Sequence, residues 1–352
     1  MDFYNTLSKQ FTVKINEPLS DYTTWRVGGK AKYLVESRSS EHLITIVELC
    51  QKFNISYFIL GRGANVLISD KAYDGLVIIN LGSNIAINDE ILEPMIYSNI
   101  QSVRTQSING NNFINFDVLE IDQSACQRKI VKVESGANIS TVFHKGLSFG
   151  LSGLQWYAGI PASVGGAVFN NIHGGNHYIS EVIESVEIID QNLELKLLSN
   201  LEMKFEYDFS ILHLLKRPIV SVNFALYIDD PIRSLDTWNK WAILKKNQAR
   251  NSAGSTWRNI SIDEQKTANL ESNSIGYILD KVLNLKGTRV GGAYLSSTGH
   301  SNFIETENGA TAQNVLDLME IIFNTVYLRL GVKLKPEIFF IGFSDEQLSC
   351  FL

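Results

Sequence analysis

The chain has 352 residues, of which 45% are hydrophobic and 19% are charged, and its formal net charge is −6. This length and composition predict two or three folded units with apolar cores, and they exclude a disordered chain. The mild acidity argues against a nucleic-acid partner, because such binding depends on clustered Lys and Arg. The three cysteines, at positions 50, 126 and 350, are too few and too scattered for a disulfide scaffold.

The N-terminal residues contain no basic region followed by an apolar run. We therefore expect neither a secretory signal nor a transit peptide, and we expect a cytoplasmic protein. Residues 146–180 lack Asp, Glu, Lys and Arg, but their glycines, Pro161 and polar side chains do not suit a membrane span. No membrane partner is expected.

The first third of the chain predicts a compact α/β unit. A strand at Tyr33–Glu36 precedes an amphipathic helix at residues 41–52, and a buried strand at 57–60 follows. Residues 83–128 are polar, which indicates an insertion, and Asn109-Gly110-Asn111 predicts a hairpin turn within it.

The rest of the chain predicts α+β structure. One helix is expected to begin after an Asn138 cap, and a long helix is expected to end at Gly331. Helices are expected at residues 138–149, 238–248, 274–285 and 312–330, and strands at 130–133, 182–189, 193–198, 219–227 and 333–341.

Two glycine-rich segments are candidates for ligand binding. Gly61–Asn65 follows a strand, so its N–H groups suit an anion-binding nest, although a plain tight turn is the more common role of so short a motif. Val66 stands where a dinucleotide fingerprint has its third glycine. Gly159–Ala167 suits either a flat aromatic ligand lying on bare backbone or close packing of two chain segments.

Single polar residues allow two interpretations each. Ser255, after Gly254, is a proton donor on a hinge or an ordinary turn residue. Glu337 is a desolvated general acid or a surface carboxylate on an edge strand. His173 and His177 are four residues apart, but the glycines between them do not suit a helical metal face, and we expect no metal site.

Taken in order, eight motifs between residues 20 and 342 resemble the UDP-N-acetylenolpyruvoylglucosamine reductase family. They are Thr24–Ala31, Gly61–Asp70, Gly159–Asn170, Phe205-x-Tyr207-x-x-Ser210, Ala253-Gly254-Ser255, Lys286–Ala293, His300–Ile304 and Leu334–Gly342.

The resemblance implies an α+β chain with a two-subdomain FAD-binding fold of the vanillyl-alcohol-oxidase (PCMH) type and a C-terminal α+β substrate domain. It places the FAD-binding subdomains at residues 1–82 and 83–228, with the insertion at about 83–128, and the substrate domain at 229–352. We expect a monomer that uses FAD and NADPH and binds a UDP-sugar substrate.

The activity implied by the resemblance is reduction of an enolpyruvyl sugar nucleotide in peptidoglycan precursor synthesis. NADPH reduces FAD, the flavin passes a hydride to C3 of the enolpyruvyl group, and the enolate is protonated at C2. Ser255 matches the proton donor, and Glu337 matches the acid that polarises the substrate carboxylate. The implied FAD contacts are Arg26, Gly61, Arg62, Gly63, Ala64, Asn65, Gly159, Ile160, Pro161, Ser163, Gly165 and Gly166, and the implied substrate contacts are Tyr207, Arg258, Asn259 and His300.

Some positions depart from the family pattern. Asp208 stands where the family has an arginine that binds the substrate carboxylate, and His173 stands where the family has a small residue. A carboxylate repels a developing enolate, so either Arg258 or Arg250 supplies the missing charge or the substrate differs. The alternatives are a related flavoprotein acting on another nucleotide sugar or enol acid, and a flavin-binding protein without turnover. Because Ser255 and Glu337 are both present, the sequence favours an enzyme.

Overall fold

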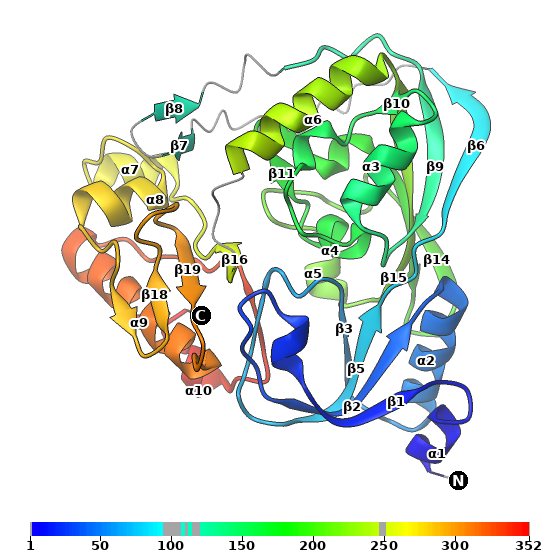
Figure 1. The fold of residues 1–352 in the computed structure, drawn as a ribbon, viewed down its shortest axis with the longest axis horizontal. Helices are drawn as coiled ribbons and strands as arrows, with labels where there is room; N and C mark the ends of the chain where they lie inside the picture. The colour runs from blue at the N-terminus through cyan, green and yellow to red at the C-terminus, as the bar shows by residue number, and fades with distance from the viewer. Residues whose placement is uncertain (1, 94–106, 110–111, 115–119, 246–250, 352) are drawn as a thin grey trace.

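The computed structural model describes residues 2–93, 107–109, 112–114, 120–245 and 251–351. The chain forms three units, which lie at the bottom, the upper right and the left of Figure 1 in chain order. Among the described residues, no helix has both the length and the apolar character needed to span a membrane.

The N-terminal unit is a small sheet with one long helix against it. Its elements are α1 (Phe3–Leu7), β1 (Val13–Pro18), η1 (Leu19–Tyr22), β2 (Lys30–Ser37), α2 (Ser40–Lys52), β3 (Tyr57–Leu60), β4 (Val66–Ile68) and β5 (Tyr73–Asn80). The strand order is β1-β2-β5-β3, in which β2, β5 and β3 run parallel. The predicted strand and helix at residues 33–52 are confirmed by β2 and α2.

The middle unit is an antiparallel sheet of order β14-β13-β15-β9-β6, with β10 paired to β15. Its elements are β6 (Ile85–Leu92), β7 (Ser107–Asn109), β8 (Asn112–Ile114), β9 (Arg128–Glu134), α3 (Ile139–Leu147), β10 (Leu151–Ser152), η3 (Gln155–Tyr157), α4 (Val164–Phe169), β11 (His173–Gly174), β12 (His177–Tyr178), η4 (Ile179–Val182), β13 (Ile183–Ile189), β14 (Leu195–Ser199), α5 (Leu212–Leu215) and β15 (Ile219–Ile228). Asn138 caps α3 as predicted, because its side-chain oxygen accepts from Ser140 N–H at 2.8 Å. The predicted hairpin is present as β7 and β8.

The C-terminal unit surrounds a second antiparallel sheet, of order β16-β19-β18-β17. The elements from residue 231 on are α6 (Pro231–Lys245), β16 (Ser252–Ser255), α7 (Ile262–Thr267), α8 (Ile275–Tyr277), η5 (Ile278–Val282), β17 (Arg289–Val290), β18 (Ala293–Leu295), β19 (Phe303–Thr306), α9 (Ala312–Leu330), β20 (Phe339–Ile341) and α10 (Asp345–Leu348). Helix α9 ends at Gly331, whose φ of 70° is the left-handed cap that the sequence predicts. The strand expected at residues 333–341 is regular only in β20.

Helix α6 belongs with the middle unit, although the sequence placed the domain boundary at residue 229. Trp238 and Trp241 lie in the apolar core of that unit, and the Trp238 ring stacks on Phe143 of α3 at 4.1 Å. Figure 1 shows α6 lying alongside α3, away from the C-terminal sheet. The packing therefore moves the structural boundary towards the end of α6.

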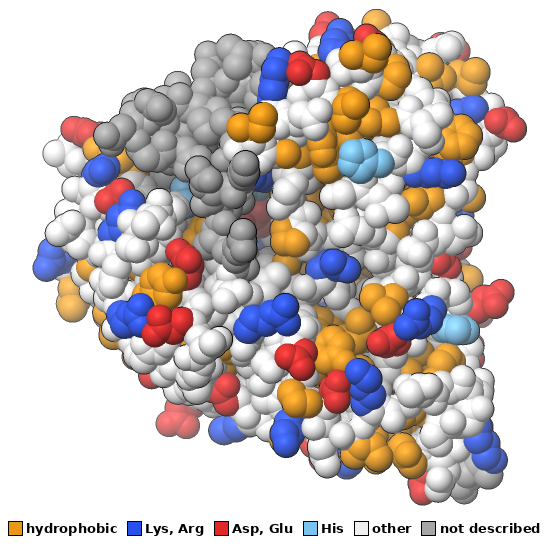
Figure 2. Space-filling view, in the orientation of Figure 1, with side chains coloured by type: hydrophobic (Ala, Val, Ile, Leu, Met, Phe, Trp, Pro, Cys, Tyr) orange, Lys and Arg blue, Asp and Glu red, His pale blue; other side chains and the backbone are white. Residues whose placement is uncertain are grey.

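The N-terminal and C-terminal units are joined by contacts between residues far apart in sequence. Trp25 is buried in the apolar core of the C-terminal unit, where its Nε1 donates to the carbonyl oxygen of Ile304 at 2.7 Å. In addition, β20 pairs in parallel with β4. On the face in Figure 2, Lys and Arg are interspersed with Asp and Glu, as the nearly balanced composition predicts.

Asp70 ties the N-terminal unit to the start of α9. Its two carboxylate oxygens accept from the N–H groups of Ala312 and Gln313, each at 2.9 Å. An anion at a helix N-terminus satisfies free donors and interacts favourably with the helix dipole. We therefore expect Asp70→Ala to lower the free energy of unfolding by about 1–2 kcal/mol in urea denaturation. Asp74→Ala removes only an exposed pair with Lys32, so a loss as large as that of Asp70→Ala would contradict this role.

Candidate active site

Glu337 lies beside Ser255 because two segments of the C-terminal unit run together. The Glu337 N–H donates to the carbonyl oxygen of Thr256 at 2.9 Å, and Trp257 forms a bridge with Pro336. Ser255 is the last residue of β16, directly before Thr256. The backbone of Glu337 is therefore bonded to the residue that directly follows Ser255, although the two residues are 82 positions apart in the sequence.

The Gly61–Asn65 loop adjoins the same segment. The Asn65 side-chain amide donates to the carbonyl oxygen of Glu337 at 3.1 Å, and Phe339 N–H donates to the carbonyl oxygen of Asn65 at 3.0 Å. Within the described part of the chain, the N–H groups of Arg62–Asn65 donate no hydrogen bond. Unsatisfied N–H groups in a turn suit a bound anion such as a pyrophosphate.

Two glycines of this loop are required by close approaches. A Cβ at Gly63, where φ is +60°, would lie 2.0 Å from the carbonyl oxygen of Tyr22. A Cβ at Gly61 would lie 2.2 Å from Oγ of Ser163, so the first glycine segment contacts the second. Thr24 N–H donates to the carbonyl oxygen of Gly63 at 3.0 Å. This bond holds the Thr24–Ala31 motif, which includes Arg26, next to the loop.

The Gly159–Gly166 segment supports both interpretations of its glycines. Gly165 is a close-packing site, because its N–H donates to Ser135 at 2.7 Å and a Cβ there would lie 3.1 Å from Ser135. Gly159, Pro161 and Gly166 are exposed instead. The exposed backbone next to the Gly61–Asn65 loop fits a flat cofactor lying across both segments.

Asp208 is held in an unusual backbone conformation. Glu206 and Phe209 exchange two backbone hydrogen bonds across a tight turn, and Asp208 has a φ of 50° within it. Asn171 and Ser210 fasten this turn to α4 and the loop after it, at 2.9 and 2.7 Å. Asp tolerates left-handed backbone better than most residues, and such strain is common at functional sites.

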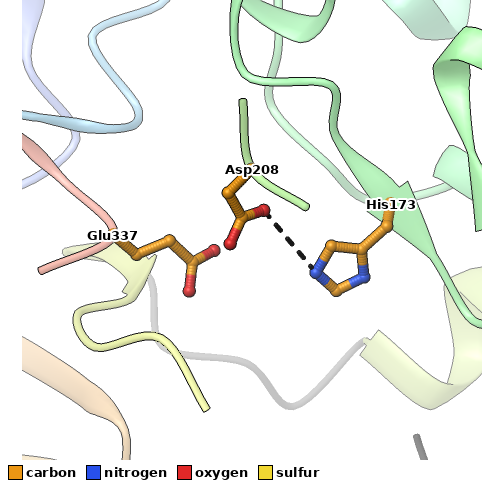
Figure 3. A group of neighbouring side chains, drawn as sticks. All are labelled: His173, Asp208 and Glu337. Atoms are coloured by element: carbon orange, nitrogen blue, oxygen red, sulfur yellow. Dashed lines mark ion pairs between the residues drawn. The ribbon is translucent and has the colours of Figure 1, made fainter. Parts of the chain in front are cut away.

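The Asp208 turn brings together His173, Asp208 and Glu337 (Figure 3). The Asp208 carboxylate lies between the other two side chains, with its Oδ1 3.9 Å from Nε2 of His173. Burial raises the pKa of Glu337 well above its usual value and Asp208 raises it further, while Arg258 opposes both. Burial also raises the pKa of Asp208. Two such neighbouring carboxyl groups favour holding a proton between them at neutral pH.

The predicted substrate residues fall into two groups. Tyr207 stacks on His173 at 5.5 Å, and Arg258 Nη2 donates to the main-chain carbonyl of Asp208 at 3.1 Å, so both lie at the cluster. Asn259 accepts from the N–H of Ile275 at 3.1 Å. His300 lines a separate hollow of about 30 Å³, room for about one water molecule. Arg250 lies outside the described residues.

Two residues at the site were not predicted from the sequence to be functional. His173 was considered as a partner of His177 and as a departure from the family pattern, yet the structure pairs it with Asp208. The available signal was that both positions depart from the family pattern. Lys245, at the end of α6, lies against Gly159, and burial lowers its pKa to about 8.

His177 anchors the hairpin that carries His173. Its ring nitrogens lie 2.7 Å from Glu181 and 2.7 Å from Glu120, and its ring stacks on Trp156. Burial alone would lower its pKa, but hydrogen bonds to the two carboxylates raise it to about 9.

This raised pKa predicts a pH-dependent stability. The charged His177 stabilises the fold fully below its unfolded pKa of about 6.5, and this contribution is lost as the pH rises through about 9. We expect the Tm of the wild type to fall more between about pH 6 and pH 9.5 than that of His177→Gln. Parallel Tm profiles in scanning calorimetry would exclude this role.

Comparisons with known proteins identify the family of the chain. A family model described as the C-terminal domain of UDP-N-acetylenolpyruvoylglucosamine reductase matches residues 245–341, beginning where α6 ends, and a model described as an FAD binding domain matches residues 97–196. The UDP-N-acetylenolpyruvoylglucosamine reductase of Caldicellulosiruptor bescii is 30% identical over 95% of this chain and 92% of its own length. The chain belongs to the UDP-N-acetylenolpyruvoylglucosamine reductase family.

Other members of the reductase family also match this chain over most of its length. The reductase of Clostridium novyi is 31% identical over 95% of this chain and 94% of its own length. The crystal structure of the reductase from Thermus caldophilus covers 94% of this chain and 99% of its own, with a TM-score of 0.66 and 24% identity. These matches confirm the predicted family and the predicted α+β, FAD-binding fold.

Proposed function

We propose that this chain uses FAD and NADPH to reduce the enolpyruvyl ether of UDP-N-acetylenolpyruvoylglucosamine to the lactyl ether of UDP-N-acetylmuramate, in peptidoglycan precursor synthesis. The observation that carries the proposal is the meeting of Ser255, Glu337 and the free N–H groups of Arg62–Asn65 in one place. A hydride carrier, a proton donor and an acid near the substrate carboxylate are what this reduction requires.

FAD fits the residues that are present. The Gly61–Asn65 loop would hold its pyrophosphate, and Gly159–Gly166 would form the floor under its ring. FAD, when bound, supplies the hydride for C3 of the enolpyruvyl group, and NADPH restores the reduced cofactor. The aliphatic part of the Lys245 side chain lies beside Gly159.

The remaining residues act on the substrate and its proton. Ser255 would donate the proton to C2, and its neighbour Gly254, with a φ of +81° and no atom within 4 Å of a Cβ there, supports this role by leaving open space beside it. Burial raises the pKa of Glu337 well above its usual value, which favours the protonated form, and in that form it would donate a hydrogen bond to the substrate carboxylate as negative charge develops there. Tyr207 and Arg258 border the same space.

Stopped-flow spectroscopy tests the proposal in two steps. The purified protein should carry FAD, NADPH should bleach it without oxygen, and UDP-N-acetylenolpyruvoylglucosamine should restore its colour with one UDP-N-acetylmuramate formed per flavin. Protein that takes up no FAD, or reduced flavin that persists with the substrate, would reject it. Light scattering would test separately whether the protein is a monomer, as predicted.

Asp208 supports one alternative function, the reduction of another nucleotide sugar or enol acid, because an acid stands where the family has an arginine. The exchange Asp208→Arg distinguishes the two. Higher activity on the enolpyruvyl substrate would mean that Asp208 weakens an otherwise ordinary site. Abolished activity would mean that the site is built around Asp208.

A further inference from the structure

We propose that His173, Asp208 and Glu337 form a binding site for one divalent transition-metal ion. The site has one imidazole nitrogen and two carboxylate groups as ligands, a set suited to ions such as Mn²⁺, Fe²⁺ or Zn²⁺. This replaces the expectation from the sequence that the chain has no metal site, which rested on the glycines between His173 and His177 and on the scatter of the other histidines.

The geometry of the cluster suits a metal ion. One ligand atom from each of the three side chains lies within 4.8 Å of the others. Two ligands on opposite sides of a divalent ion are about 4–5 Å apart, because each lies about 2.0–2.6 Å from it. Figure 3 shows the Asp208 carboxylate between the carboxylate of Glu337 and the imidazole of His173, so the three side chains already lie together.

One oxygen of the central ligand, Oδ2 of Asp208, lacks a hydrogen-bond partner. The Asp208 side chain is only 8% exposed, and its Oδ2 is buried without a hydrogen bond. A buried carboxylate oxygen without a partner is costly, and it is satisfied by a cation or by a proton. His173 is 32% exposed, which leaves a path for an ion to enter from solvent.

The cations of the protein do not satisfy the two carboxylates. Arg258 is the charged group beside them, but its Nη2 is bonded to the main-chain carbonyl of Asp208. Among the described residues, neither Asp208 nor Glu337 forms an ion pair with a Lys or Arg.

A cation here would also act on the substrate. It would present positive charge to the carboxylate and the developing enolate of an enolpyruvyl group, where the chain otherwise places two acids. This second role rests on the proposed function, whereas the binding of the ion does not.

The test of binding uses the FAD-loaded protein and Mn²⁺ alone. We expect electron paramagnetic resonance to detect one saturable Mn²⁺ site per chain. Asp208→Asn and Glu337→Gln should each raise the Kd about 10-fold or more. Glu206→Gln is the matched control, since it removes an exposed carboxylate two residues from Asp208 and should leave the Kd unchanged. The flavin spectrum and the Tm of each variant report whether it is folded.

The outcomes separate this inference from the proposed function. No saturable Mn²⁺ binding, or equal binding by the wild type and both cluster variants, would overturn the site and would mean that the two acids share a proton instead. Substrate reduction by metal-free protein at an unchanged KM would overturn the role on substrate while leaving the proposed function intact. Binding without any FAD reduction by NADPH would support the site and reject the proposed function.

Discussion

Ser255→Ala should slow the oxidation of the reduced flavin by the enolpyruvyl substrate about 10²–10⁴-fold, the usual contribution of a positioned general acid. The reduction of the flavin by NADPH should not change, because that step needs no proton from Ser255. The physical basis is its position at the end of β16, after the Gly254 hinge and beside the segment that carries Glu337. Stopped-flow spectroscopy measures the two half-reactions separately.

The control for this prediction is a serine of the same unit with a structural role. Ser261 caps α7 by accepting from Glu264 N–H at 3.1 Å, so Ser261→Ala should lower stability by about 1 kcal/mol and leave both half-reactions unchanged. If Ser255→Ala oxidises its flavin as fast as Ser261→Ala does, Ser255 is a turn residue and another group delivers the proton.

Local signals in the sequence predicted local structure well. The Asn138 cap, the end of α9 at Gly331 and the pairing of β7 with β8 each depend on residues within a few positions of one another. The sequence also singled out the two glycine segments that are proposed to bind FAD, because close approaches of the backbone require small residues. Nothing in the sequence indicated that the two segments contact each other at Gly61 and Ser163.

Contacts between distant residues were not predictable from patterns. Trp25 looked like part of an N-terminal motif, yet its ring lies in the core of the C-terminal unit, 279 positions from its hydrogen-bond partner. Likewise, His173 and Asp208 meet only because the turn at residues 206–209 is fastened to the end of α4. Hydrophobic periodicity specifies which face of an element is buried, but not which other element covers it.

Asp208 has a different role in the folded protein from the one that its charge alone indicates. From the sequence, it was an anion in the place of a cation. In the structure it is a buried acid beside Glu337 and His173, with a raised pKa and an oxygen that lacks a partner. Its effect on the substrate therefore depends on what it holds, a proton or a metal ion, more than on its charge as a free carboxylate.

Gly63→Ala should cause loss of bound FAD and lower the free energy of unfolding by about 3 kcal/mol or more. The added Cβ would lie 2.0 Å from the carbonyl oxygen of Tyr22, and backbone cannot move aside as a flexible side chain can. Relief of this contact would shift the loop whose N–H groups are proposed to hold the pyrophosphate. Flavin absorbance per chain and urea denaturation measure the two effects.

Gly309→Ala is the control that separates the effect of the contact with Tyr22 from the effect of backbone strain. Gly309 also has a positive φ, of +86°, but a Cβ there would meet nothing within 4 Å. Its replacement should therefore cost only the left-handed strain of about 1–2 kcal/mol and leave FAD bound. Equal losses of stability in the two variants, with full FAD in both, would mean that the Gly61–Asn65 loop can relax around the added methyl group. The close approach to Tyr22 would then not be what requires glycine at position 63.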